Sequence, residues 1–124
     1  MNVHAVRAEA DLVVSVHGHL VVGTRHLLQD AVAPTVAQGV RRVVVDFHET
    51  PYVDSTGLGT LAALARLLRE QGGSLRTVGM IAELRDACTV AKLDGVLTHH
   101  SSIDAALAEG VPAEHRASRP DGPA

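Results

Sequence analysis

The most constraining feature of this chain is a short apolar segment followed by a serine-containing turn and a leucine-rich run. Residues 43–47 (VVVDF) are mostly β-branched or aromatic and far too short to span a membrane, so they predict a buried strand. Residues 54–59 (DSTGLG) place Ser55 where a helix should begin. The first N–H groups of a helix lack intrahelical partners, and the helix dipole makes that end positive. Ser55 therefore either caps the helix or is a site where phosphate is added and removed.

Strand and helix patterns alternate along the rest of the chain. Strands are expected at residues 3–8 and 12–17, and their short link predicts an antiparallel hairpin. A helix is expected from its cap Thr24 to residue 38, kinked or broken at Pro34. The helix after the turn should start near Thr56 or Gly57 and end at a left-handed cap formed by residues 72–73. The remaining elements are expected at 75–78 (strand), 82–90 (helix), 96–97 (strand) and 102–109 (helix, capped by Ser101 or Ser102).

This order, β-β-α-β-α-β-α-β-α, predicts an α/β fold with a mostly parallel sheet, one antiparallel edge strand and packed helices. Parallel strands joined through helices connect by right-handed crossovers, and such sheets bind ligands and partners at the carboxyl ends of their strands. The Ser55 turn is expected at one of these ends. The helical periodicity predicts buried Leu61, Leu64, Ala65 and Leu68, exposed Thr60, Arg66, Arg69 and Glu70, and, on the 82–90 helix, buried Leu84, Ala87 and Cys88.

Length and composition limit the domain organisation and the class of partner. A chain of 124 residues is long enough for one core, which we expect within residues 1–110. Residues 111–124 hold three of the five prolines and are expected to form a flexible C-terminal tail. A net charge of −3 and 2% aromatic residues argue against direct nucleic-acid binding, which needs a basic surface and stacking groups.

The same sequence predicts a cytoplasmic protein. Cys88 is the single cysteine, which excludes an intramolecular disulfide and favours a reducing compartment. The N-terminus lacks the basic and apolar regions of a signal peptide, and no segment approaches the roughly 18 to 20 apolar residues of a membrane helix.

Three catalytic or ligand-binding patterns are matched only superficially. Residues 57–62 fit the dinucleotide fingerprint G-x-G-x-x-A, but they do not directly follow a strand, and the next strand ends without a carboxylate. The serine-hydrolase elbow G-x-S-x-G requires a glycine where this chain has Val53. A metal site needs three or four convergent ligands. We therefore expect no metal site and interpret the paired histidines as solvent-exposed loop residues: His17, His19, His99 and His100.

The 54–59 segment resembles the D-S-[ST]-G-[LI]-G signature of the STAS domain, best known in bacterial anti-sigma factor antagonists. Further segments are similar to the family pattern at matching places along the chain, so that the resemblance covers roughly residues 3–109. They are residues 18–20 (GHL), 72–79 (GGSLRTVG) and 93–97 (LDGVL).

The resemblance implies that Ser55 is a phosphoacceptor and that Asp54, Thr56, Gly57 and Leu58 contact the partner. That partner would be an anti-sigma factor that is also a serine kinase with a GHKL-type ATP site. The unphosphorylated domain would bind the kinase and so free a sigma factor for transcription in a stress response. The kinase would phosphorylate Ser55 and a serine phosphatase would restore it. The domain itself would use no cofactor and would not be an enzyme.

The chain departs from the family pattern in two places, and other functions stay open. Val21 stands where many members carry an acid associated with kinase recognition, and residues 91–94 read AKLD rather than TGLD. The runner-up function is a STAS module that is not phosphorylated and serves as a scaffold or accessory subunit of a sensor or transporter complex. An enzyme would require a histidine converging on Ser55. Gly57 is expected to have a positive φ or to admit the close approach of a partner's backbone.

Overall fold

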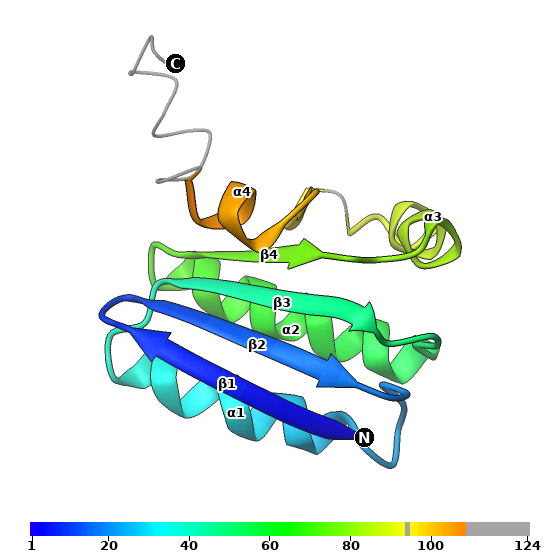
Figure 1. Cartoon of the computed structure of the whole chain (residues 1–124), viewed down its shortest axis with the longest axis horizontal. Helices are drawn as coiled ribbons and strands as arrows, with labels where there is room; N and C mark the ends of the chain where they lie inside the picture. Colours follow the sequence, from blue (N-terminus) through cyan, green and yellow to red (C-terminus); the bar gives the residue numbers. More distant parts are fainter. Residues whose placement is uncertain (94, 109–124) are drawn as a thin grey trace, which may run out of the picture.

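The computed structural model describes residues 1–93 and 95–108, and its elements follow the expected order (Figure 1). Residue 94 and the predicted tail at 111–124 lie outside the described residues, so the tail stays a prediction. The elements are β1 (Asn2–Ala8), β2 (Asp11–His17), α1 (Arg25–Ala37), β3 (Arg42–Glu49), α2 (Ser55–Glu70), β4 (Ser74–Val78), α3 (Ala82–Val90), β5 (Leu97–His100) and α4 (Ile103–Ala108).

The five strands form one mixed sheet in the order β1-β2-β3-β4-β5. β1 pairs antiparallel with β2, and every other neighbouring pair is parallel. The expected parallel sheet with one antiparallel edge strand is therefore confirmed. Because β2, β3 and β4 run in the same direction, the connections that follow them all emerge at one edge of the sheet (Figure 1).

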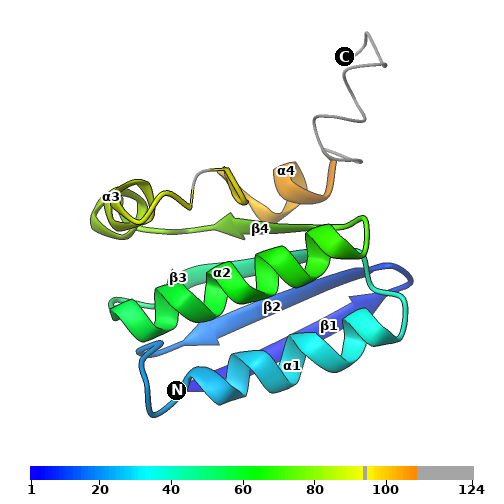
Figure 2. The same cartoon turned by 180° about the vertical axis from the view of Figure 1, so that it is seen from behind.

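α1 and α2 cover one face of the sheet and close the main core (Figure 2). Alternate residues of β2 and β3 point into this core, as the period of a strand requires. Since aromatic residues are almost absent, valine and leucine fill the space. The main core includes Val14 and Val16 of β2, Val43, Val45 and Phe47 of β3, Leu28 and Val32 of α1, and Leu61, Leu64, Ala65 and Leu68 of α2.

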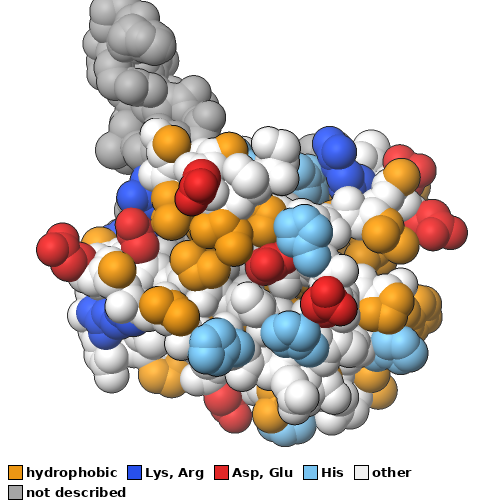
Figure 3. All heavy atoms as spheres, viewed as in Figure 1, with side chains coloured by type: hydrophobic (Ala, Val, Ile, Leu, Met, Phe, Trp, Pro, Cys, Tyr) orange, Lys and Arg blue, Asp and Glu red, His pale blue; other side chains and the backbone are white. Residues whose placement is uncertain are grey.

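The opposite face of the sheet carries a smaller core beneath α4. Val44 and Val78 pack there with Ala106 of α4. Arg76 of β4 is buried on the same side and donates a hydrogen bond to the carbonyl oxygen of Ala106, which ties α4 to the sheet. Figure 3 views this face and shows hydrophobic side chains grouped near α4, with histidines spread across the rest of it.

Two expectations for the long helices are contradicted. α1 continues through Pro34, so the helix is not broken there, and the expected kink stays a prediction. Pro34 is exposed, and the helix is anchored in the core on both sides of it by Leu28 and Val36, so packing compensates for the lost backbone hydrogen bond. Thr60 is buried rather than exposed, with 2% of its surface accessible, because its hydroxyl donates to the Thr56 carbonyl oxygen 3.0 Å away and its methyl group can then face the core.

The remaining boundaries differ from the expectations by one to three residues. α2 begins at Ser55, and β5 covers Leu97–His100 rather than 96–97. Ala87 is only half-buried, whereas Cys88 and Leu84 are buried as expected. The left-handed cap after α2 is confirmed, with φ of +80° at Gly72, and Ser102 caps α4 by accepting a hydrogen bond from the Ala105 N–H at 3.0 Å. Within the described part of the chain no helix has the length and apolar character needed to cross a membrane.

Candidate functional site

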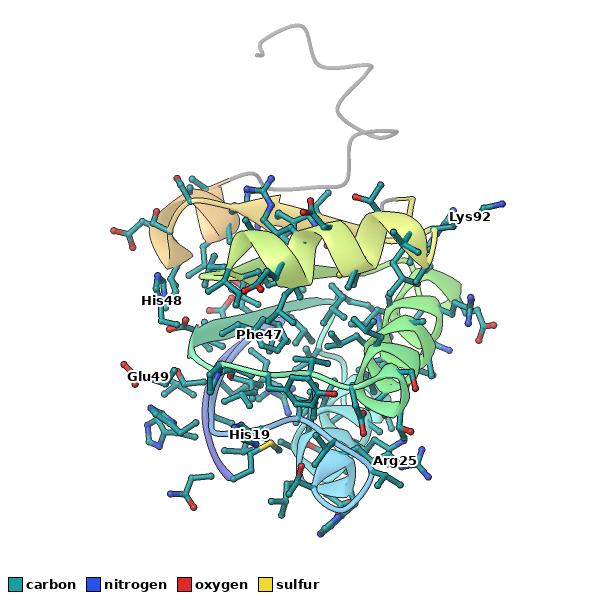
Figure 4. All side chains as sticks on the ribbon, turned by 90° about the vertical axis from the view of Figure 1, so that its right-hand side faces the viewer. His19, Arg25, Phe47, His48, Glu49 and Lys92 are labelled. Atoms are coloured by element: carbon teal, nitrogen blue, oxygen red, sulfur yellow. The ribbon has the colours of Figure 1, made fainter. Side chains whose placement is uncertain are left out.

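The Ser55 turn lies at the edge of the sheet where β2, β3 and β4 end. Figure 4 faces this edge, with Phe47, His48 and Glu49 marking the end of β3, His19 marking the connection from β2 to α1, and Arg25 marking the start of α1. α2 begins at Ser55, after a five-residue connection from β3. The turn is therefore at the carboxyl end of the central strand, where open parallel sheets place their binding sites.

Asp54 caps α2. Its backbone is extended, with φ of −88° and ψ of −179°, and its Oδ1 accepts a hydrogen bond from the Gly57 N–H at 2.7 Å. This is the geometry of an N-cap residue, whose side chain satisfies an N–H that the helix itself leaves without a partner. Its Oδ2 accepts a second hydrogen bond, from the Val22 N–H at 3.2 Å. One carboxylate therefore joins the start of α2 to the loop between β2 and α1.

Ser55 takes no part in that capping. Its side chain is exposed, and its hydroxyl makes no hydrogen bond with the residues that the structure describes. The interpretation of Ser55 as the helix cap is therefore wrong, since the neighbouring aspartate has that role. A hydroxyl at the positive end of a helix, exposed and not needed for the fold, is accessible to a modifying enzyme.

Gly57 is buried because the turn packs tightly against the loop that precedes α1. A Cβ added at Gly57 would overlap the carbonyl oxygen of Leu20 and lie 2.7 Å from Cγ1 of Val53. Gly57 is helical and its φ is not positive, so the expectation of a left-handed conformation is wrong. The glycine is needed for close approach to this chain's own backbone.

Backbone hydrogen bonds hold the two loops side by side. The Leu20 N–H donates to the Tyr52 carbonyl oxygen at 3.0 Å, and the Asp54 N–H donates to the Leu20 carbonyl oxygen at 3.2 Å. Leu20 and Val53 thereby form an isolated parallel bridge, and both side chains are buried. The position of the Ser55 turn is thus fixed by the core and by main-chain bonds on both sides.

Exposed apolar side chains flank this turn, and the sequence did not single them out. Val22 is 66% exposed and Tyr52 is 52% exposed, although both belong to the two paired loops. The rings of Tyr52 and His19 meet edge to face with their centroids 5.8 Å apart. Exposed apolar groups beside a fixed polar turn are typical of a protein–protein contact surface. The signals available in the sequence were the single tyrosine and the apolar pair at 21–22.

The other expected partner-contacting residues differ in accessibility. Thr56 is half-buried, and Leu58 is half-buried with its side chain against the main core. Gly57 is buried, and the Asp54 carboxylate is engaged by two backbone N–H groups. Of the residues at 54–58, Ser55 therefore has the most accessible polar side chain.

The histidine pairs lie in different environments. His17 and His19 are exposed, as expected, whereas His99 and His100 are half-buried in β5 rather than in a loop. Nδ1 of His99 lies 2.6 Å from the Thr77 hydroxyl oxygen. In the part of the chain that the structure describes, no three histidine, cysteine or acidic side chains converge as metal ligands would.

Solved structures of other proteins share this architecture. The crystal structure of an anti-sigma factor antagonist from Mycobacterium paratuberculosis has a TM-score of 0.76 and 25% sequence identity, covering 87% of this chain and 92% of that one. The Bacillus anti-sigma factor antagonist SpoIIAA has a TM-score of 0.69 and 15% identity in both its unphosphorylated and its phosphorylated forms. The unphosphorylated form covers 98% of this chain and 99% of that one, and the phosphorylated form covers 84% and 96%. The mixed sheet and its helices thus have the fold of these anti-sigma factor antagonists.

Sequence comparisons lead to the same class. The anti-sigma-B factor antagonist of Bacillus subtilis (strain 168) is 30% identical over 76 residues, which cover 61% of this chain and 69% of that protein. The model of the family described as Mlab, STAS domain, matches residues 3–99. The chain therefore belongs to the STAS domain family.

Proposed function

We propose that this protein is an antagonist of an anti-sigma factor, controlled by phosphorylation at Ser55. In its unphosphorylated form it binds an anti-sigma factor that is a serine kinase with a GHKL-type ATP site, and so frees a sigma factor for transcription. Phosphorylation by that kinase releases the complex, and a serine phosphatase restores the binding form. The observation that carries the proposal is the exposed Ser55 hydroxyl, which stands at a helix N-terminus while Asp54 performs the capping. The anti-sigma-B factor antagonist similar to this chain supports the class of partner.

The geometry gives a physical reason for release on phosphorylation. A phosphoserine adds about −1.5 to −2 charges and three acceptor oxygens. Exposed on the free protein, this group is solvated and is stabilised by the helix dipole by roughly 0.3 to 1 kcal/mol. A partner packed on Val22 and Tyr52 would remove water from that dianion next to the Asp54 carboxylate. Burying an uncompensated charge is costly, so the complex should dissociate without refolding of the domain.

The proposed contact surface combines the turn with its apolar surroundings. It consists of Asp54, Ser55, Thr56, Gly57 and Leu58, as the family resemblance implies, together with Val22 and Tyr52, which are exposed on the two paired loops. Buried Gly57 would act by holding the turn against Leu20. The exposed valine and tyrosine would supply the apolar area of contact.

Phosphorylation mapping tests the proposal directly. The purified chain is incubated with ATP and each anti-sigma kinase encoded in its host, and the products are analysed by intact mass and peptide mapping. We expect one phosphate, on Ser55, and none in Ser55→Ala, which should remain folded because its hydroxyl makes no described contact. Modification confined to Thr56, or no modification by any of these kinases, would refute the assignment.

Val21→Asp is expected to accelerate phosphorylation of Ser55 by a kinase that presents a basic group to this position. Val21 is half-buried in the loop bonded to the Ser55 turn, so a carboxylate there could reach a partner bound over the turn. The acceleration should shrink with added salt, because exposed charges are screened beyond about 10 Å at 0.1 M ionic strength. Single-turnover phosphorylation at low and high salt is the measurement, with Val90→Asp as control because Val90 is 82% exposed on α3. Equal rates for Val21→Asp and wild type at every salt concentration would show that this kinase recognises another surface.

A further inference from the structure

A polar cavity opens at the carboxyl ends of β4 and β5. It has a volume of about 200 Å³ and adjoins a groove of about 300 Å³ along α3, with Arg85 and His99 contributing to the walls of both. In Figure 1, α3 lies beyond the arrowhead of β4, so the cavity is on the edge of the sheet where parallel strands end. Ligands of open parallel sheets bind at such an edge.

The side chains around the 200 Å³ cavity are those that recognise oxyanions. Five elements or connections contribute to it, and no acidic side chain is among its described lining residues, although the whole chain has a net charge of −3. Guanidinium, imidazole and hydroxyl groups donate hydrogen bonds to phosphate oxygens. The polar lining residues are Thr77 of β4, Arg85 of α3, His99 and His100 of β5, and Ser101.

Two of these groups are arranged for binding. The Arg85 side chain is exposed, and its guanidinium makes no hydrogen bond or ion pair with the described residues, so it brings its full charge to the cavity. The His99 ring is held in place by the buried Thr77, whose hydroxyl oxygen is 2.6 Å from Nδ1. An exposed cation therefore lies beside an imidazole ring that the fold holds in place.

The adjoining groove differs in its chemistry. Asp86 and Thr89 line it together with Ala82, and these residues stand on one face of α3 with Arg85 between them. A carboxylate repels a second anion but accepts hydrogen bonds from hydroxyl groups. The groove therefore suits a neutral, hydroxylated group attached to the anion.

We propose that this cavity binds a phosphate-type oxyanion, either inorganic phosphate or the phosphate of a small phosphomonoester. Arg85 supplies the charge, the exposed Ser101 supplies a hydroxyl that can donate a hydrogen bond, the His99 ring forms part of the wall, and the groove along α3 receives the organic part of a phosphomonoester. The site is separate from the phosphorylation of Ser55 and does not depend on it.

Titration of the ¹⁵N-labelled protein with inorganic phosphate, at ionic strength held constant with chloride, tests the site. Saturable shifts are expected at the amides of Gly79, Met80 and Ser101, which surround the cavity. Arg85→Gln should weaken binding roughly tenfold or more, as expected when a hydrogen bond to a charged group is lost. Arg66→Gln, which removes an exposed arginine from α2, should bind like wild type.

A parallel titration with glycerol 3-phosphate distinguishes the two sources of the oxyanion. Tighter binding than inorganic phosphate, with added shifts at Asp86 and Thr89, supports the site and assigns the phosphomonoester as its ligand. Equal binding of the two supports the site with phosphate alone as ligand. Shifts that grow linearly without saturation, or equal affinities for wild type and Arg85→Gln, would identify an adventitious ion only and overturn the proposal.

Discussion

Gly57→Val is expected to lower the free energy of unfolding by about 3 kcal/mol, at the upper end of what overpacking a core costs. The added Cβ would overlap the Leu20 carbonyl oxygen, which is main chain and cannot rotate away. Relief would require α2 to move away from the loop, breaking the hydrogen bonds that Asp54 makes with Val22 and Leu20. Urea unfolding followed by circular dichroism measures the effect.

Gly59→Ala is the matched control on the same helix. A Cβ at Gly59 meets no atom within 4 Å, and replacing a glycine by alanine inside an exposed helix raises stability by up to about 1 kcal/mol. The two substitutions should therefore have opposite signs although they lie two residues apart. If Gly57→Val unfolds at the same urea concentration as wild type, the close contact with Leu20 does not exist in solution.

The second large effect is expected on binding. Ser55→Asp should weaken the affinity for the anti-sigma kinase by roughly a hundredfold, which corresponds to about 2.7 kcal/mol for a charge buried beside Asp54 without a counterion. Stability should change little, because the Ser55 side chain is exposed and a carboxylate is favoured near a helix N-terminus. Calorimetric titration with the kinase, together with thermal unfolding, separates the two quantities.

Gln71→Glu provides the control for charge alone. It adds one negative charge at the exposed C-terminal end of α2, at the other end of the helix from Ser55. We expect its affinity for the kinase to equal that of wild type. Should Ser55→Asp bind as tightly as Gln71→Glu, the turn would lie outside the interface.

Local chemistry explains which parts of this fold could be predicted from the sequence. The apolar run at 43–47 and the helical spacing of apolar residues after Gly57 are local patterns that can be recognised from neighbouring residues alone. The structure has β3 and α2 at these two places. The caps at Gly72 and Ser102 also follow from one or two residues. Alternation of strands and helices then left few possible topologies, and the observed sheet is the expected one.

The features that the sequence did not predict depend on contacts between distant segments. The bridge between Leu20 and Val53 joins residues more than 30 positions apart, and no local pattern marks it. The same pairing buries Gly57, whose conformation was predicted wrongly. It also brings Val22 beside the turn, a position that the sequence did not indicate. Thr60 was expected on the outer face because it is polar, but its hydroxyl is satisfied within its own helix.

The bonds that position the Ser55 turn have a consequence for how such proteins can diversify. Leu20, Tyr52 and Asp54 hold the two loops together through main-chain groups, whose hydrogen bonds do not depend on the identity of the neighbouring side chains. The exposed side chains at 19, 22 and 52 can therefore be exchanged during evolution while Ser55, the proposed phosphorylation site, keeps its place. Duplicated copies in one genome could in this way acquire separate kinases and avoid cross-talk, each retaining the same chemistry at an unchanged serine.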